Sequence, residues 1–155
     1  MSPSLFDKDT FLAEEVSGAN DTKYPVIPPG EYAAISKSLD SRQFQGTKDP
    51  TKTFTALDIV WGIDDAKVKE ATGLDNPTCR QSIFLDLNDA GKLDMNATKN
   101  VQLGRLREAL GLNDPDRPFS FSQLLGQPAL VRIESSENKN DPDNPYSNVT
   151  KVATI

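Results

Sequence analysis

The segment TFTALDIVWGI, residues 53–63, constrains the fold of this chain most, because its side chains alternate with the period of two that is typical of a β-strand. One face of such a strand would be almost wholly apolar, and it would carry Thr55, Leu57, Ile59, Trp61 and Ile63. This face predicts the wall of a hydrophobic core, with Trp61 inside it. The opposite face would be mixed and would carry Phe54, Ala56, Asp58 and Val60. A strand of this kind fits the wall of a barrel that binds a ligand on its outer surface.

Four further segments predict strands. The clearest is residues 79–88, where the apolar face would consist of Ile83, Leu85 and Leu87. Its other face would carry Phe84 and Asp86, so this segment repeats the pattern of residues 53–63. The remaining strands are expected at residues 31–39, 127–136 and 146–155.

Residues 96–111 predict the longest helix, because leucines at positions 103, 106 and 110 recur with helical spacing. Asn96 or Thr98 would cap its start, and Gly111 suits a left-handed residue at its end. Shorter helices are expected at residues 66–74 and at 120–126, the latter capped by Ser120. Residues 1–24 are polar, and we expect an N-terminal arm with a short helix capped by Asp9.

The predicted elements follow the order strand, strand, strand, helix, strand, strand. This order is typical of the five-stranded oligonucleotide/oligosaccharide-binding barrel, the OB-fold, an all-β fold with one or two helices. The domain would span residues 25–155. In this fold ligands lie across the second and third strands, between the loops that join strands one to two and four to five. Those loops are predicted at residues 40–52 and 137–145, and both are polar.

The residue inventory argues against an enzyme. The chain has no histidine, which removes the usual general base and the commonest zinc ligand. Its single cysteine, Cys79, excludes an intrachain disulfide and a cysteine metal cage. We therefore expect no catalytic residue, metal or cofactor. No apolar run is long enough to span a membrane, and the N-terminal residues lack the layout of a signal peptide, so a cytoplasmic protein is expected.

The charge of the chain is uneven. Its net charge is −6, which taken alone argues against nucleic acid as a partner. Residues 36–53, however, hold four basic side chains against two acidic ones, so a basic surplus lies just before the central strand. A solvated lysine-rich loop is the simpler interpretation of such a surplus, and a phosphate-binding loop is the functional one.

Binding of single-stranded nucleic acid needs cations along the phosphates and flat side chains on which bases stack. The predicted outer face and loops offer both, from Lys37, Arg42, Phe44, Lys48, Lys52, Phe54, Arg80, Phe84, Arg132 and Tyr146. Two alternatives remain open for Phe54 and Phe84: packing under the N-terminal arm, or a contact with a second copy of the chain. Asp58 and Asp86 would share this face and would repel phosphate.

Five segments occur in an order and spacing that resemble a known family: PPGEYAAI (28–35), TALDIVWGI (55–63), GRLREALGL (104–112), LLGQPALVRI (124–133) and YSNVTKV (146–152). The family comprises phage-encoded proteins regarded as single-stranded DNA-binding proteins with an OB-type barrel. The resemblance implies a replication or recombination role, in the cytoplasm of the host cell, by coating exposed strands without reading sequence. Many such proteins end in an acidic tail that recruits partners, whereas this sequence ends in the apolar KVATI.

Two functions are therefore weighed. The first is a non-enzymatic, sequence-tolerant binder of single-stranded DNA, with replication or recombination proteins and a second copy of the chain as further partners. The alternative is a structural or adaptor β-barrel, in phage assembly or as a protein-binding module, without nucleic-acid binding. The acidic balance of the chain favours the alternative.

Overall fold

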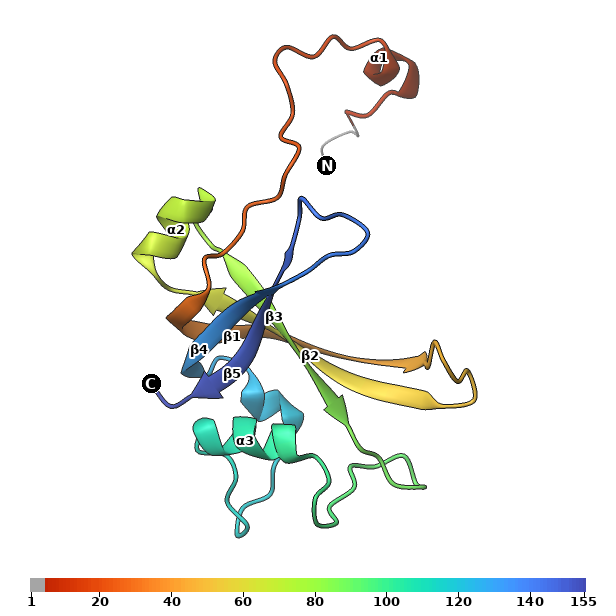
Figure 1. Cartoon of the computed structure of the whole chain (residues 1–155), viewed down its shortest axis with the longest axis vertical. Coiled ribbons are helices and arrows are strands. Elements are labelled where there is room, and N and C mark those ends of the chain that lie inside the picture. The colour runs from red at the N-terminus through yellow and green to blue at the C-terminus, as the bar shows by residue number, and fades with distance from the viewer. Residues whose placement is uncertain (1–4) are drawn as a thin grey trace.

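Five strands ring round in a single closed sheet (Figure 1). The computed structural model describes residues 5–155, and its strands are β1 (Gly30–Gln45), β2 (Thr53–Ile63), β3 (Thr78–Leu85), β4 (Pro128–Ser136) and β5 (Tyr146–Ala153). Around the ring the order is β1-β2-β3-β5-β4, and β4 pairs again with β1. All neighbours are antiparallel except β3 and β5, which run parallel and pair at Arg80 and Asn148. A mostly-β fold with five strands is thus confirmed.

The helices are short. They are α1 (Lys8–Leu12), α2 (Ala66–Thr72), α3 (Val101–Ala109) and the 3-10 turn η1 (Phe121–Leu124). The short helices predicted at residues 66–74 and 120–126 are present as α2 and η1. Because α2 stands between β2 and β3, the chain order is not the simple order strand, strand, strand, helix, strand, strand. Helix α3 lies across one end of the ring, where its Leu103 and Leu106 join the core (Figure 1).

The first strand is longer than predicted. We expected a polar loop over residues 40–52, but β1 continues to Gln45 and the connection covers only residues 46–52. Within β1 lies a β-bulge at Lys37, where the register with β2 shifts between Ser36 and Ser38. The bulge reverses the facing of the residues beyond it, so Ser36 and Leu39 both turn toward the core. The reversal explains why the apolar residues of 31–39 do not alternate strictly along the sequence, with Ala34 and Leu39 both facing the core.

The core is organised around the central strand, as predicted. Leu57, Ile59, Trp61 and Ile63 are all buried. Trp61 is fully enclosed, and its indole Nε1–H donates a hydrogen bond of 2.9 Å to the side-chain oxygen of the buried Gln81 on β3. This bond satisfies the one polar group of the ring inside the apolar interior.

The predicted start of α3 is wrong. The helix begins at Val101 rather than at residue 96, and neither Asn96 nor Thr98 caps it. The residue before the helix is Asn100, whose backbone is left-handed with φ 56°. Its amide instead donates to the carbonyls of Asp86 and Asp94, both at 2.9 Å, and so fixes the end of the β3–α3 connection. Gly111 does adopt the predicted left-handed conformation, with φ 71°.

The N-terminal arm extends away from the ring of strands (Figure 1). Its helix is capped by Asp7 and not by Asp9, because the Asp7 carboxylate accepts from the backbone N–H groups of Asp9 and Thr10. The arm meets the body at Tyr24, whose backbone N–H donates to the Asn144 side chain at 2.7 Å. In residues 5–155 no helix has the length and apolar character that crossing a membrane requires.

The buried Trp61–Gln81 pair makes a testable contribution to stability. Gln81→Met should lower the free energy of unfolding by about 1–3 kcal/mol, because it leaves the indole N–H without an acceptor. Trp61→Phe should cost less in the Gln81→Met background than in the native one. Urea unfolding of the two single variants and the double variant measures this coupling, and strictly additive effects would contradict it.

Candidate functional site

Three phenylalanine rings gather on the outer face of β1, β2 and β3. Phe44 and Phe54 are direct cross-strand partners, and Phe84 lies opposite Ala56, one row along. The ring centroids are separated by 5.7 Å for Phe44 and Phe54, 6.1 Å for Phe44 and Phe84, and 6.4 Å for Phe54 and Phe84. The side chain of Phe54 is 41% exposed and that of Phe84 58%. We call these three residues the phenylalanine cluster; it is a preassembled aromatic surface open to solvent.

A charge cluster lies beside the rings on the same face. Asp58 is only 4% exposed, and its Oδ2 accepts from Arg42 at 2.7 Å and from Arg80 at 2.9 Å. The hydroxyl of Ser82, its cross-strand neighbour on β3, donates to Oδ1 at 2.6 Å. The guanidinium of Arg42 also lies 5.0 Å from the centre of the Phe44 ring, within cation–π range. One carboxylate thus positions two cations next to the phenylalanine cluster.

The electrostatics of Asp58 differ from the expectation. An exposed carboxylate that repels phosphate was predicted here, and this is wrong because Asp58 is buried beneath its partners. Burial alone would raise the pKa of this carboxyl. The hydrogen bonds from Arg42 and Ser82 and the charges of Arg80 and Arg42 outweigh burial, so the pKa lies below its ordinary value of 3.8. Two cations against one anion leave the cluster with a net positive charge.

The connection between β1 and β2 carries two more cations to the same region. Lys48 and Lys52 lie in residues 46–52 at the tip of the β1–β2 hairpin, and both are exposed. The tip is ordered by backbone bonds from Gly46 N–H to the Lys52 carbonyl, and from Lys52 N–H to the Asp49 carbonyl. A side chain at Gly46 would come within 3.0 Å of the Phe54 ring, so the loop packs closely against the phenylalanine cluster.

The structure brings seven of the ten predicted residues into one region and leaves three outside it. Lys37 lies at the β1 bulge, with its aliphatic stem over Gly62. Arg132 on β4 forms ion pairs with Glu31 and Glu134. Tyr146 begins β5, and its place in the parallel register is toward the start of β3, whereas Phe84 is near the end of that strand. The seven that gather are Arg42, Phe44, Lys48, Lys52, Phe54, Arg80 and Phe84.

Sequence reasoning missed the role of Ser82 and the linking role of Asp58. Both follow from register: Asp58 is opposite Asp40 on β1 and Ser82 on β3, and the two arginines are diagonal to it. A correct pairing of the three strands would have exposed this arrangement. The sequence alone does not show this arrangement, because it predicts a first strand that stops at residue 39, before Asp40 and Arg42.

Metal binding and cysteine reactivity were the two remaining kinds of site to consider in the described chain. Within residues 5–155, no group of His, Cys, Asp or Glu side chains is arranged to hold a metal ion. Cys79 is buried, and burial raises the pKa of its thiol to about 11, so it is an inert core residue at neutral pH.

Comparison with known proteins does not assign a family. Neither the protein-family models nor the curated proteins give a match to this chain.

The charge cluster predicts a pH-dependent stability difference. At neutral pH, Asp58→Asn should lower the free energy of unfolding by about 1–3 kcal/mol; the value is modest because both arginines are half exposed and partly screened by solvent. A lowered folded-state pKa stabilises the fold above the unfolded pKa, and that contribution disappears as pH falls through the folded value. The difference between the native protein and the variant should therefore shrink below about pH 4.

Urea midpoints at several pH values measure this effect. Asp75→Asn, on the exposed connection between α2 and β3, is the matched control and should show no comparable difference. A loss of stability in Asp58→Asn that stays constant down to pH 2 would contradict the assignment.

Proposed function

We propose that this protein binds single-stranded DNA without sequence preference, through the outer face of β1, β2 and β3. The observation that carries the proposal is the phenylalanine cluster with Arg42 and Arg80 beside it. Open aromatic faces offer stacking surfaces to any base, and neighbouring cations attract the phosphates that connect the bases. The protein would act without catalysis.

The arrangement of strands supports the proposal. We propose that the closed sheet is an OB-fold-like barrel, whose ligands lie across the second and third strands. The phenylalanine cluster spans these strands and the end of β1, next to the 46–52 loop. The resemblance to phage-encoded single-stranded DNA-binding proteins points the same way, and it extends the proposal to DNA replication or recombination in a host cytoplasm.

Local charge reconciles the proposal with the acidic composition. The net charge of −6 belongs to the whole chain, whereas the candidate face presents four cations, Arg42, Arg80, Lys48 and Lys52, against the exposed Asp40 and the partly exposed Asp49. Of the two carboxylates in the row between the arginines, Asp58 is buried and its β1 partner Asp40 is exposed. Phosphates would meet guanidinium and ammonium groups and would not meet Asp58 directly.

Removal of the rings should weaken binding. Phe54→Ala and Phe84→Ala should each reduce affinity for an oligothymidylate by roughly 5- to 100-fold, since each stacked base contributes about 1–3 kcal/mol. Fluorescence anisotropy with a labelled oligonucleotide measures the change. Tyr24→Ala, which removes an exposed ring from the arm, is the matched control. Unchanged affinity in both cluster variants would place the site elsewhere.

Salt should weaken binding in proportion to the phosphates contacted. With roughly three to five phosphates neutralised, the logarithm of the association constant should fall against the logarithm of salt concentration with a slope of about −2 to −3.5. Lys48→Ala and Lys52→Ala should each reduce that slope by about 0.7, whereas Arg117→Ala, in the exposed loop between α3 and η1, should not. No binding of any oligonucleotide at low salt would refute the proposed function.

A second candidate is a structural or adaptor barrel that binds protein through the same face. Three adjacent phenylalanines with two exposed rings also form an apolar patch of the kind that protein interfaces use. Light scattering combined with an oligonucleotide shift assay separates the two candidates. Self-association that Phe54→Ala and Phe84→Ala abolish, without oligonucleotide binding, would favour the protein interface.

A further inference from the structure

The N-terminal arm exposes large apolar side chains that the rest of the chain does not cover. Leu5, Phe11, Leu12 and Val16 are all more than half exposed; Leu12, for example, is 70% exposed. The same stretch is acidic, with Asp7, Asp9, Glu14 and Glu15 against a single base, Lys8. An exposed apolar segment is costly for a soluble chain unless it docks on a partner.

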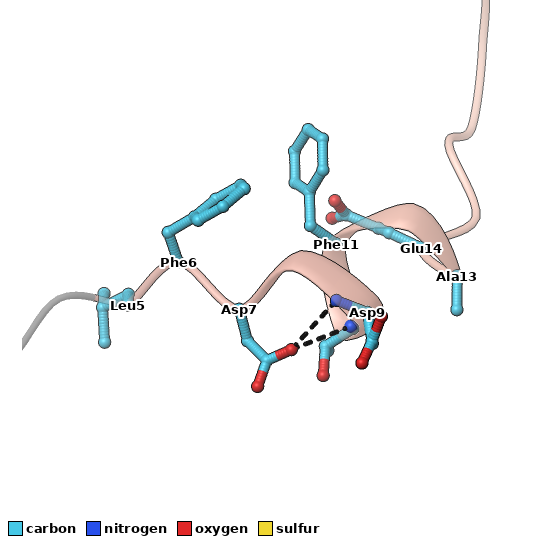
Figure 2. A pocket seen from close by; sticks show the side chains of 8 residues that line it. Leu5, Phe6, Asp7, Asp9, Phe11, Ala13 and Glu14 are labelled. Atoms are coloured by element: carbon cyan, nitrogen blue, oxygen red, sulfur yellow. Dashed lines mark hydrogen bonds between the residues drawn. The ribbon is translucent and has the colours of Figure 1, made fainter.

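The short helix α1 places two rings and a carboxylate on the same side of the turn. Figure 2 shows Phe6 and Phe11 there with Glu14 beside Phe11, and Asp7 and Asp9 on the other side. The two rings lie 5.3 Å apart between centroids, and the Asp7 cap holds the turn that brings them together. The arm therefore presents an ordered apolar edge flanked by carboxylates.

A groove of complementary character lies on the seam between β3 and β5. The two strands pair at Arg80 and Asn148 and then separate, and α3 packs against both beyond that point. The groove has a volume of about 730 Å³. Three core residues that are at most 5% exposed, Ile83, Leu106 and Val149, close its floor, and the partly exposed Val152 lies beside them. Its polar lining comes from Gln81, Ser82, Gln102, Arg105, Thr150 and Lys151.

Charge complementarity identifies what the groove would accept. Its lining holds two bases, Arg105 and Lys151, and no acid, although acidic residues outnumber basic ones in the chain. Two cations with no acid in the lining suit an acidic segment of chain. The partly exposed Val152 and the aliphatic stems of Arg105 and Lys151 give the apolar side chains of such a segment a surface to pack on.

We propose that the groove between β3, α3 and β5 binds residues 5–16 of a second copy of this chain. The arm leaves the body at Tyr24, beside the β4–β5 loop, and projects away from the end of the ring where α3 lies (Figure 1). Extended, residues 5–23 would span about 60 Å, enough to reach a neighbouring molecule. Residues 5–16 are all exposed in the described chain, so none of them is buried against the body of its own molecule.

Such a contact joins two different surfaces, and each molecule would donate one arm and accept another. Two copies that exchange arms would close as a dimer, and copies that do not exchange them would form a larger ring or an open chain. The phenylalanine cluster lies outside this contact. The inference therefore does not depend on nucleic-acid binding and can fail or succeed separately from it.

Reversing the charges of the arm in one variant, and those of the groove in another, tests the proposal on the full-length protein. The arm variant Glu14→Lys/Glu15→Lys and the groove variant Arg105→Glu/Lys151→Glu alter exposed side chains only, so both should fold, which thermal unfolding checks. Sedimentation velocity over a range of concentrations should show native self-association. Each variant alone should require at least roughly ten-fold more protein to associate, since two charge contacts are reversed.

Mixing the two variants supplies the decisive measurement. The lysine-bearing arm then meets the glutamate-bearing groove, and the native arm of one variant meets the native groove of the other, so association should recover. Lys92→Glu/Lys99→Glu, in the β3–α3 connection, is the matched control and should behave like the native protein.

Three outcomes would overturn the proposal. The first is a native protein that remains monomeric at every concentration, including one whose arm folds back on its own groove. The second is association that neither variant changes. The third is a groove variant that associates normally but loses oligonucleotide affinity, which would assign the groove to nucleic acid.

Discussion

The buried carboxylate of Asp58 is the interaction on which the outer face depends. It lies on the middle strand of three, and it binds an arginine from each neighbour and the hydroxyl of Ser82. Without Asp58, the two guanidinium groups would repel each other and lose their fixed positions next to the phenylalanine cluster. A negative residue thus creates a positive surface, because it is buried while its partners are exposed.

The central strand and its facing could be predicted from sequence because period-two alternation is a local signal. Residues 53–63 were predicted without error in their ends, and Trp61 was assigned correctly to the core. The fourth strand followed from the same alternation. In these segments the apolar face is buried along its whole length, so pattern and structure agree.

The first strand and the charge cluster could not be predicted, for a shared reason. A bulge at Lys37 breaks the alternation, and residues 40–45, which pair only with β2 as half of a hairpin, are polar apart from Phe44. Nothing local distinguishes such a strand from a loop. The contacts of Asp58 then depend on pairing among three segments, which is non-local information. The start of α3 was missed because Asn100 bonds to distant carbonyls and does not cap the helix.

The seam between β3 and β5 has a consequence for the way the ring moves. The antiparallel neighbours pair over long runs, as β1 does with β2 from Ala34 to Gln45, whereas the seam is closed by a single parallel pair. Local opening follows the places where the fewest bonds must break. The closed sheet should therefore open first between β3 and β5. Its circumference could then change while β1, β2 and β3, which carry the phenylalanine cluster, move as one rigid sheet.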